Sequence, residues 1–167
     1  MSGEQAILRA VEVREPERRT FCGYCAHRPE DEAPADGAAS RVCGECGLGL
    51  LLTADAALAP SRAEAFVVVD PGLNVQALSK RAEKLFDLAE TDVVDQPVEN
   101  VLVAADSSED ARRKLQALLS GAARGPLEGG DPAVAVVRPA RAFGVRYRAR
   151  VGRCEPGRAA LLVLSKL

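Results

Sequence analysis

The sequence predicts an α+β fold, in which a small cysteine-bearing module precedes a larger domain with a five-stranded antiparallel sheet and short helices on one face. Two Cys-x-x-Cys pairs stand near the start of the chain. After residue 65, apolar runs typical of strands alternate with turn residues and with serines placed to cap helices. A chain of 167 residues has room for one ordinary domain and a small module.

The two cysteine pairs have the spacing of a metal site. Cys22 and Cys25 form the first pair, Cys43 and Cys46 form the second, and seventeen residues separate the pairs. Two residues between thiolates let a tight turn aim both sulfurs at one point, and two such turns make a tetrahedral S4 cage. The pattern resembles a zinc ribbon and predicts one structural zinc ion, because an S4 site has no open position for substrate.

Other chemistries of these cysteines fit less well. Disulfides belong to oxidising compartments, but the N-terminal segment has no apolar signal sequence and carries four glutamates within the first 20 residues. A redox Cys-x-x-Cys needs only one pair and leaves the other unexplained. Iron in an S4 site uses the same ligands, and spacing alone does not separate it from zinc.

The chain divides by composition into four parts. We expect an N-terminal arm or helix over 1–20, a zinc ribbon over 21–52, a linker over 53–64 and the larger domain over 65–167. Within the arm, residues 4–14 have helical spacing of apolar side chains, although the end of this stretch fits a strand equally well. Leu48 to Leu52 are too apolar to stay in water, so we expect them to dock onto the larger domain. The Pro29 to Ser40 segment reads as an exposed loop of the ribbon.

The first half of the larger domain is predicted to be a hairpin followed by short helices. Phe66 to Val69 is a β-branched strand, and Asp70-Pro71-Gly72 is a turn before a return strand at 73–77. Ser79 is a good N-cap for a helix over 80–87. Thr91 and Asp92 cap a helical turn that runs toward Val94.

The second half is predicted to be one longer helix and three strands. Ser107 and Ser108 precede a helix from Glu109 to Leu119 that ends at Gly121. The three strands then follow as a meander, at 133–138, 143–152 and 158–164.

This order of elements resembles a PAS domain, most closely over Phe66 to Val103. The matching positions are Asp70, Gly72, Ser79, Leu85-Phe86 and Gln96-Pro97. Asp87 and Asp95 stand where such domains often have glycine, and we expect both to adopt the left-handed conformation that aspartate tolerates. The resemblance implies a sensor or interaction module that pairs with a protein partner or with a second copy as a homodimer.

The residue inventory does not favour an enzyme. His27 is the only histidine and lies beside the first cysteine pair, and no glycine-rich phosphate loop is present. The flavin-binding Asn-Cys-Arg-Phe motif is absent from the sequence, and the domain has no good axial ligand for haem, so neither cofactor is expected. We expect Cys154 to be a buried, inert thiol. If the domain holds a small molecule, the sequence favours lining by four residues of its core, namely Leu85, Phe86, Val137 and Tyr147.

Charge is distributed unevenly along the chain. From Arg138 onward eight basic residues accompany one acidic residue, a net charge of +7 that leaves −9 for the rest. Strand periodicity places Arg146, Arg148 and Arg150 on one face, with Val145, Tyr147, Ala149 and Val151 facing the core. This arginine face could bind an acidic partner, and a nucleic-acid-binding transcriptional regulator is the alternative function. The ribbon segment itself is not basic.

Composition indicates a bacterial, cytoplasmic protein with no membrane association. Arginine dominates over lysine and isoleucine occurs once, as in proteins from GC-rich genomes. The longest apolar stretches, Leu48 to Leu52 and Ala159 to Leu164, are far too short to cross a bilayer.

Overall fold

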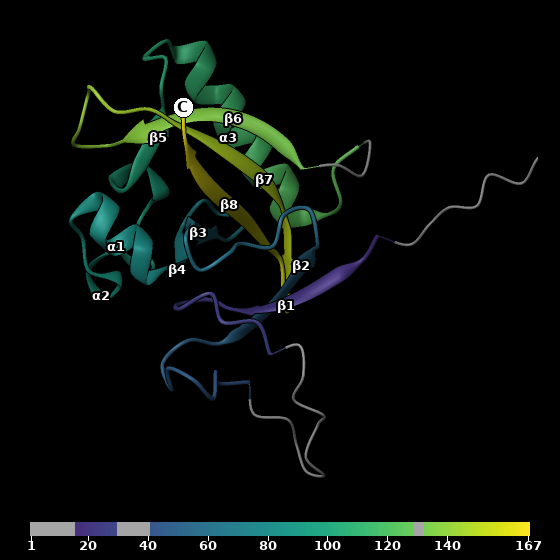
Figure 1. The fold of residues 1–167 in the computed structure, drawn as a ribbon. Coiled ribbons are helices and arrows are strands. Elements are labelled where there is room, and N and C mark those ends of the chain that lie inside the picture. Colours follow the sequence, from purple (N-terminus) through teal and green to yellow (C-terminus); the bar gives the residue numbers. More distant parts are fainter. Residues whose placement is uncertain (1–15, 30–40, 129–131) are drawn as a thin grey trace, which may run out of the picture.

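The structure is a three-layer arrangement around one antiparallel sheet. The computed structural model describes residues 16–29, 41–128 and 132–167 (Figure 1). The predicted helix over residues 4–14 and most of the predicted ribbon loop lie outside these residues. No helix among the described residues is long and apolar enough to cross a membrane.

The N-terminal part contributes a hairpin, and the larger domain begins with a second one. The first hairpin pairs β1 (Arg18–Cys22) with β2 (Leu51–Asp55), and the second pairs β3 (Ala65–Val69) with β4 (Val75–Leu78). The described part of the predicted N-terminal arm therefore includes strand residues from Arg18 onward.

Short helices follow β4. They are α1 (Lys80–Phe86), α2 (Glu90–Val93) and the 3-10 turn η1 (Val98–Asn100), and the short strand β5 (Leu102–Ala104) leads to the long helix α3 (Glu109–Arg124). Ser79 and Ser108 cap α1 and α3 as predicted, each accepting a backbone N–H three residues later. Two details differ: α2 begins before Thr91 and has no side-chain cap, and α3 continues through Gly121.

The chain ends in three long strands. They are β6 (Ala133–Pro139), β7 (Tyr147–Glu155) and β8 (Ala159–Lys166). The sheet order β4-β3-β8-β7-β6 confirms the five predicted antiparallel strands, and the short strand β5, which was not predicted, pairs with β6. Asp87 and Asp95 have φ values of 54° and 61°, so both turns survive without glycine, as expected for the PAS-like fold.

The ribbon hairpin extends this sheet. The first half of β7 pairs with β6, and its last residues pair with β2, through Thr53 opposite Glu155 and Ala54 opposite Cys154. β7 is therefore the strand that holds the two modules together. Residues 53–64 were expected to form a linker, but they pack as part of the fold. Residues 53–55 belong to β2, and Leu58 and Ala59 are buried.

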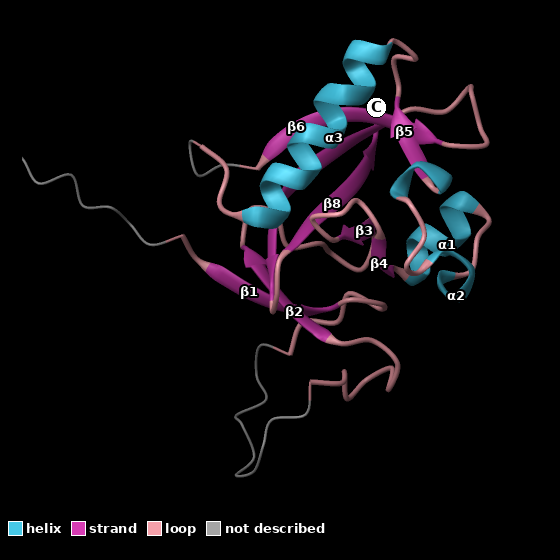
Figure 2. Cartoon of the chain, turned by 180° about the vertical axis from the view of Figure 1, so that it is seen from behind, coloured by secondary structure: helices cyan, strands magenta, loops and turns pink. Residues whose placement is uncertain are grey.

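Both faces of the central strands are covered. One face packs under α1, α2, η1 and α3, and Figure 2 shows α3 lying across the sheet. The opposite face, called here the outer face, carries a second apolar cluster that joins the ribbon to the sheet. In that cluster Phe21 meets Phe66 edge-on, with ring centroids 5.6 Å apart.

The uninterrupted apolar strands follow from this double coverage. In β3, Phe66 and Val68 face the ribbon, whereas Val67 and Val69 face the helices. The same alternation runs along β8, with Leu161 and Val163 on the outer face. A strand with one face in water alternates polar and apolar residues, whereas a strand that is covered on both faces is apolar at every position.

Leu58 closes the outer layer over Gly152. A Cβ added at Gly152 would lie 2.7 Å from the Leu58 side chain. The Leu58 side chain therefore occupies the space that a larger residue at position 152 would need. Leu58 is 1% exposed.

We predict that Leu58→Ala lowers the free energy of unfolding by about 2–5 kcal/mol, because it leaves a cavity between the ribbon and the sheet. Urea denaturation of the metal-loaded protein measures this. Leu48→Ala is the matched control: Leu48 is 73% exposed, and its truncation should change the free energy by less than about 0.5 kcal/mol. Equal effects of the two substitutions would contradict the docking of the ribbon through Leu58.

Candidate functional site

Two tight backbone turns hold the cysteines. Cys22 ends β1, and its carbonyl accepts the N–H of Ala26 at 3.1 Å. In the second turn the carbonyl of Cys43 accepts the N–H of Gly47 at 2.9 Å, and Gly47 has a φ of 65°. The hydrogen bond from Gly23 N–H to the Leu50 carbonyl at 2.8 Å joins the turns.

The four sulfurs form a compact cluster. All four lie within 4.8 Å of one another. The Cys22 and Cys46 sulfurs are 3.7 Å apart, and those of Cys25 and Cys43 are 3.8 Å apart. A zinc ion with bonds of about 2.3 Å to four tetrahedral sulfurs requires sulfurs about 3.8 Å apart. The cluster is thus close enough to hold a metal ion and has the shape of a zinc ribbon-like pair of knuckles.

Backbone N–H groups point at the sulfurs, as thiolate ligands require. Tyr24 and Cys25 donate to the Cys22 sulfur at 3.3 and 3.4 Å, and Gly49 donates to the Cys46 sulfur at 3.5 Å. Burial nevertheless raises the pKa of the Cys22 thiol to about 12. A cation bound among the sulfurs would offset this cost of burying the Cys22 thiolate.

The fifth cysteine stands apart from this site. Cys154 lies in β7 inside the outer-face apolar cluster and is fully buried. Burial raises the pKa of its thiol to about 12. The expected buried thiol is confirmed, and such a group is unreactive at neutral pH.

His27 braces the cysteine turns. Its Nδ1 lies 2.5 Å from a Glu45 carboxylate oxygen and 2.8 Å from the Arg62 guanidinium, and Arg62 also donates to Glu45 at 2.6 Å. These three side chains tie the first cysteine turn, the second turn and the segment before β3 to one another. His27 is not among the clustered metal-ligating groups.

Tyr24 connects the first cysteine turn to the helices. Its carbonyl accepts the N–H of Lys80 at the start of α1, at 2.9 Å. Its hydroxyl donates to Glu83 at 3.1 Å. Glu83 in turn accepts the N–H of Glu90, at the start of α2, at 2.8 Å. The first cysteine turn therefore contacts α1 directly and α2 through the Glu83 side chain.

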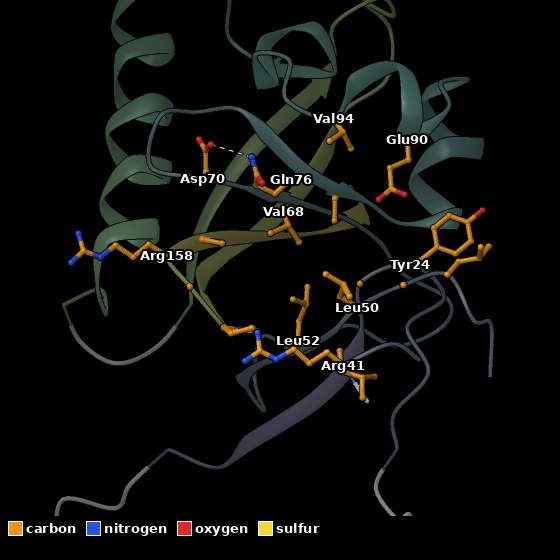
Figure 3. A pocket seen from close by; sticks show the side chains of 18 residues that line it. Tyr24, Arg41, Leu50, Leu52, Val68, Asp70, Gln76, Glu90, Val94 and Arg158 are labelled. Atoms are coloured by element: carbon orange, nitrogen blue, oxygen red, sulfur yellow. Dashed lines mark hydrogen bonds between the residues drawn. The ribbon is translucent and has the colours of Figure 1, made fainter. Parts of the chain in front are cut away.

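A groove of about 530 Å³ opens where the ribbon meets the outer face of the sheet (Figure 3). Its walls come from both cysteine turns, β3, β4, α2 and the turn between β7 and β8. In Figure 3, Leu50 and Leu52 face Val68, and Glu90 and Tyr24 lie at one side. Sequence reasoning missed this groove. The available signal was the run from Leu48 to Leu52.

That leucine run does not dock as a unit. Leu52 packs against the outer-face cluster, but Leu48 is 73% exposed and Leu50 57% exposed. The expectation that the whole run is buried against the larger domain is wrong. Phe21, Ala54 and Leu58 fill that contact instead. The register of the β1–β2 pair turns the Ala54 side chain toward the sheet. Leu48 and Leu50 come before β2 in the chain and line the groove instead.

The four residues predicted to line a ligand pocket belong to the helix-side core. Phe86, Val137 and Tyr147 are buried there, and Leu85 packs against them at its margin. The groove beside the ribbon includes none of the four.

The predicted arginine face is only partly available. The alternation along β7 is confirmed, since Tyr147, Ala149 and Val151 are buried while Arg148 is exposed. Val145 is 41% exposed, against expectation, because β7 begins only at Tyr147. Arg150 pairs with Glu64 at 2.7 Å and also donates to the Ala57 carbonyl. Arg146 and Arg148 stay exposed.

Glu90 is a partly buried acidic residue of the groove. Its carboxylate accepts the Leu78 N–H at 3.0 Å. Burial raises the pKa of Glu90, and the nearby Glu83 charge acts in the same direction, although the Leu78 hydrogen bond opposes both.

Comparisons with known proteins give structural likenesses only. No protein-family model matches the sequence, and no curated protein matches it. The PAS domain of the Cronobacter turicensis quorum-sensing receptor RpfR, solved with C12:0, is 15% identical with a TM-score of 0.46, covering 65% of this chain and 97% of that domain. The PAS domain of nitrogen regulation protein NR(II) from Vibrio parahaemolyticus is 20% identical with a TM-score of 0.44, covering 63% and 90%. Because both TM-scores are below 0.5, the PAS-like description rests on the strand order and helix placement given above.

We predict that Gly49→Ala disrupts the metal site. A Cβ at position 49 would fall on the Cys22 sulfur and 2.8 Å from the Tyr24 backbone nitrogen, so the two cysteine turns must move apart. Metal affinity measured by competition with a chromophoric chelator should fall by about ten-fold or more, in line with other changes around metal ligands.

Gly44→Ala is the control for this substitution. A Cβ at position 44 meets no atom within 4 Å, so metal affinity should stay at the wild-type value. Wild-type affinity in both variants would contradict the close packing of Gly49 on Cys22.

We predict that Glu90 titrates above the ordinary glutamate range and that Glu83→Gln moves its pKa downward. The substitution removes the repelling charge and keeps an acceptor for the Glu90 N–H. Because a raised acid pKa means that the folded state binds the extra proton, Glu90 costs stability as pH rises from its ordinary value through its folded pKa. Carboxyl carbon chemical shifts followed by NMR during a pH titration measure this, and an unchanged Glu90 midpoint in the variant would contradict it.

Proposed function

We propose that this chain is a non-enzymatic regulatory protein in which a four-cysteine zinc site stabilises a PAS-like module for small-molecule sensing or protein interaction. The observation that carries the proposal is the construction of the ribbon into the sheet, through β2–β7 pairing and a shared apolar cluster. A metal site placed in this way supports the surface on which a partner or ligand would act.

Zinc is the metal that the donor set supports best. Four cysteine sulfurs at tetrahedral spacing leave no position for a substrate or for catalytic water, so the ion would be structural. Iron fits the same sulfurs and is distinguished by its colour and redox activity. We place this protein in the bacterial cytoplasm, because thiolate ligands persist in a reducing compartment.

Signalling is supported by the path from the metal site to the helices. Tyr24 contacts α1 through its carbonyl and its hydroxyl, and Glu83 extends that contact to α2. A stimulus that alters the ribbon or the groove would therefore reach the helix side of the sheet, from which a dimer partner or another protein can read it.

The nucleic-acid alternative has less support. Of the three arginines proposed for it, Arg150 is held by Glu64 within the chain. Arg138, another basic residue of the C-terminal part, lies over the Phe143 ring, with its guanidinium carbon 4.4 Å from the ring centroid. Duplex and single-stranded DNA titrations at low salt provide the check, since phosphate binding strengthens as salt falls.

Native mass spectrometry followed by zinc removal tests the proposed function. We expect one zinc ion per chain, and chelation should shift the amide NMR signals of Lys80 and Glu83 as the Tyr24 contacts are lost. Cys43→Ser should behave like the chelated protein. Cys154→Ala, which lies outside the metal cluster, should keep its zinc.

Three results would contradict the proposal. They are absence of zinc from the purified protein, unchanged α1 signals after zinc removal, and robust turnover of a substrate by the pure protein.

A further inference from the structure

The groove between the ribbon and the sheet has the size and composition of a ligand site. Its volume of about 530 Å³ falls within the range of small-molecule pockets, roughly 300–1,000 Å³. Its floor is apolar, formed by Leu52, Val68 and Ala77, and Leu48 and Leu50 line it while remaining largely in water. Exposed leucines gathered at one hollow indicate a surface that something apolar covers.

The charged groups of the groove are not equally free. Asp70 accepts the Asn74 N–H at 2.9 Å and the Gln76 amide at 3.1 Å. Glu90 accepts the Leu78 N–H at 3.0 Å and lies in surroundings that favour its neutral form. The two acidic groups are thus held by hydrogen bonds within the protein.

The two basic groups are exposed at the rim. Arg41 and Arg158 line the groove and form no ion pair with any residue of the described ranges. Figure 3 shows the guanidinium of Arg158 extending outward from the rim. Its flexible stem allows the group to turn over the mouth of the groove when an anion arrives.

We propose that this groove binds an organic anion with an apolar body, whose tail lies on the Leu52, Val68 and Ala77 floor and whose acidic head is held by Arg41 and Arg158. The proposal rests on the function proposed above and names the ligand class of the module. It places the ligand on the outer face of the sheet, against the ribbon, rather than among the helix-side core residues Leu85, Phe86, Val137 and Tyr147.

The site depends on both modules. Gly23, Tyr24 and Leu48 to Leu52 belong to the ribbon, whereas Val68, Gln76 and Ala77 belong to β3 and β4. The groove therefore exists only while the cysteine turns are folded, so metal binding and ligand binding should be coupled.

Isothermal titration of the zinc-loaded full chain with decanoate tests the proposal. We expect saturable binding at one site. Decyltrimethylammonium, which has the same tail and the opposite charge, should bind at least about ten-fold more weakly, because the rim groups without an ion pair among the described residues are cationic. Removing zinc should abolish decanoate binding.

Two variants separate the head and tail contacts. Arg41→Gln combined with Arg158→Gln should weaken decanoate binding by about five- to ten-fold, the effect of two partly exposed ion pairs. Leu50→Glu, at a position that is 57% exposed, should also weaken it. Arg146→Gln combined with Arg148→Gln is the matched control: it removes two arginines that do not line the groove and should leave binding unchanged.

Three outcomes would overturn the proposal. They are absence of decanoate binding to the zinc-loaded protein, equal affinity for the cationic amphiphile, and unchanged affinity in the Arg41/Arg158 double variant. If decanoate fails to bind while zinc removal still shifts the α1 signals, the ligand class is wrong and the zinc-stabilised regulatory function stands.

Discussion

The pairing of β2 with the end of β7 is the contact on which the rest of the arrangement depends. Two residues of β2, Thr53 and Ala54, continue the sheet beyond the point where β6 leaves β7. This short ladder fixes the ribbon hairpin in register with the outer face of the sheet. Because strand side chains alternate with period two, a slip of one residue would turn Ala54 away from the apolar cluster.

The second core follows from this pairing. With the hairpin in place, Phe21 reaches Phe66, and Leu58 covers Gly152. The four-cysteine cluster lies at the other end of this hairpin, so a metal ion held there would reinforce the packing on the sheet. A ribbon of this size has too little apolar surface to fold well alone, and the PAS-like sheet provides the surface that it lacks.

The groove is a consequence of incomplete coverage. The ribbon packs closely at Phe21 and Leu58, but Leu48 and Leu50 lie outside the outer-face cluster and line the groove. Apolar side chains on both sides of the resulting gap stay partly in water (Figure 3). This differs from a pocket inside the helix-side core, where the residues that we expected to line a ligand site are packed together.

The sequence by itself determined the features that depend on short separations along the chain. Cysteine spacing predicted the S4 cluster, serine caps predicted two helix starts, and aspartates in left-handed turns replaced glycine as expected. Only the tertiary structure decided where the ribbon docks, which leucines it buries and which arginines form ion pairs with distant residues. These outcomes depend on contacts such as Thr53 with Glu155 and Arg150 with Glu64, between residues far apart in the chain. The uninterrupted apolar runs of β3 and β8 indicated that both sheet faces are covered, but periodicity within a strand does not identify the segment that covers them.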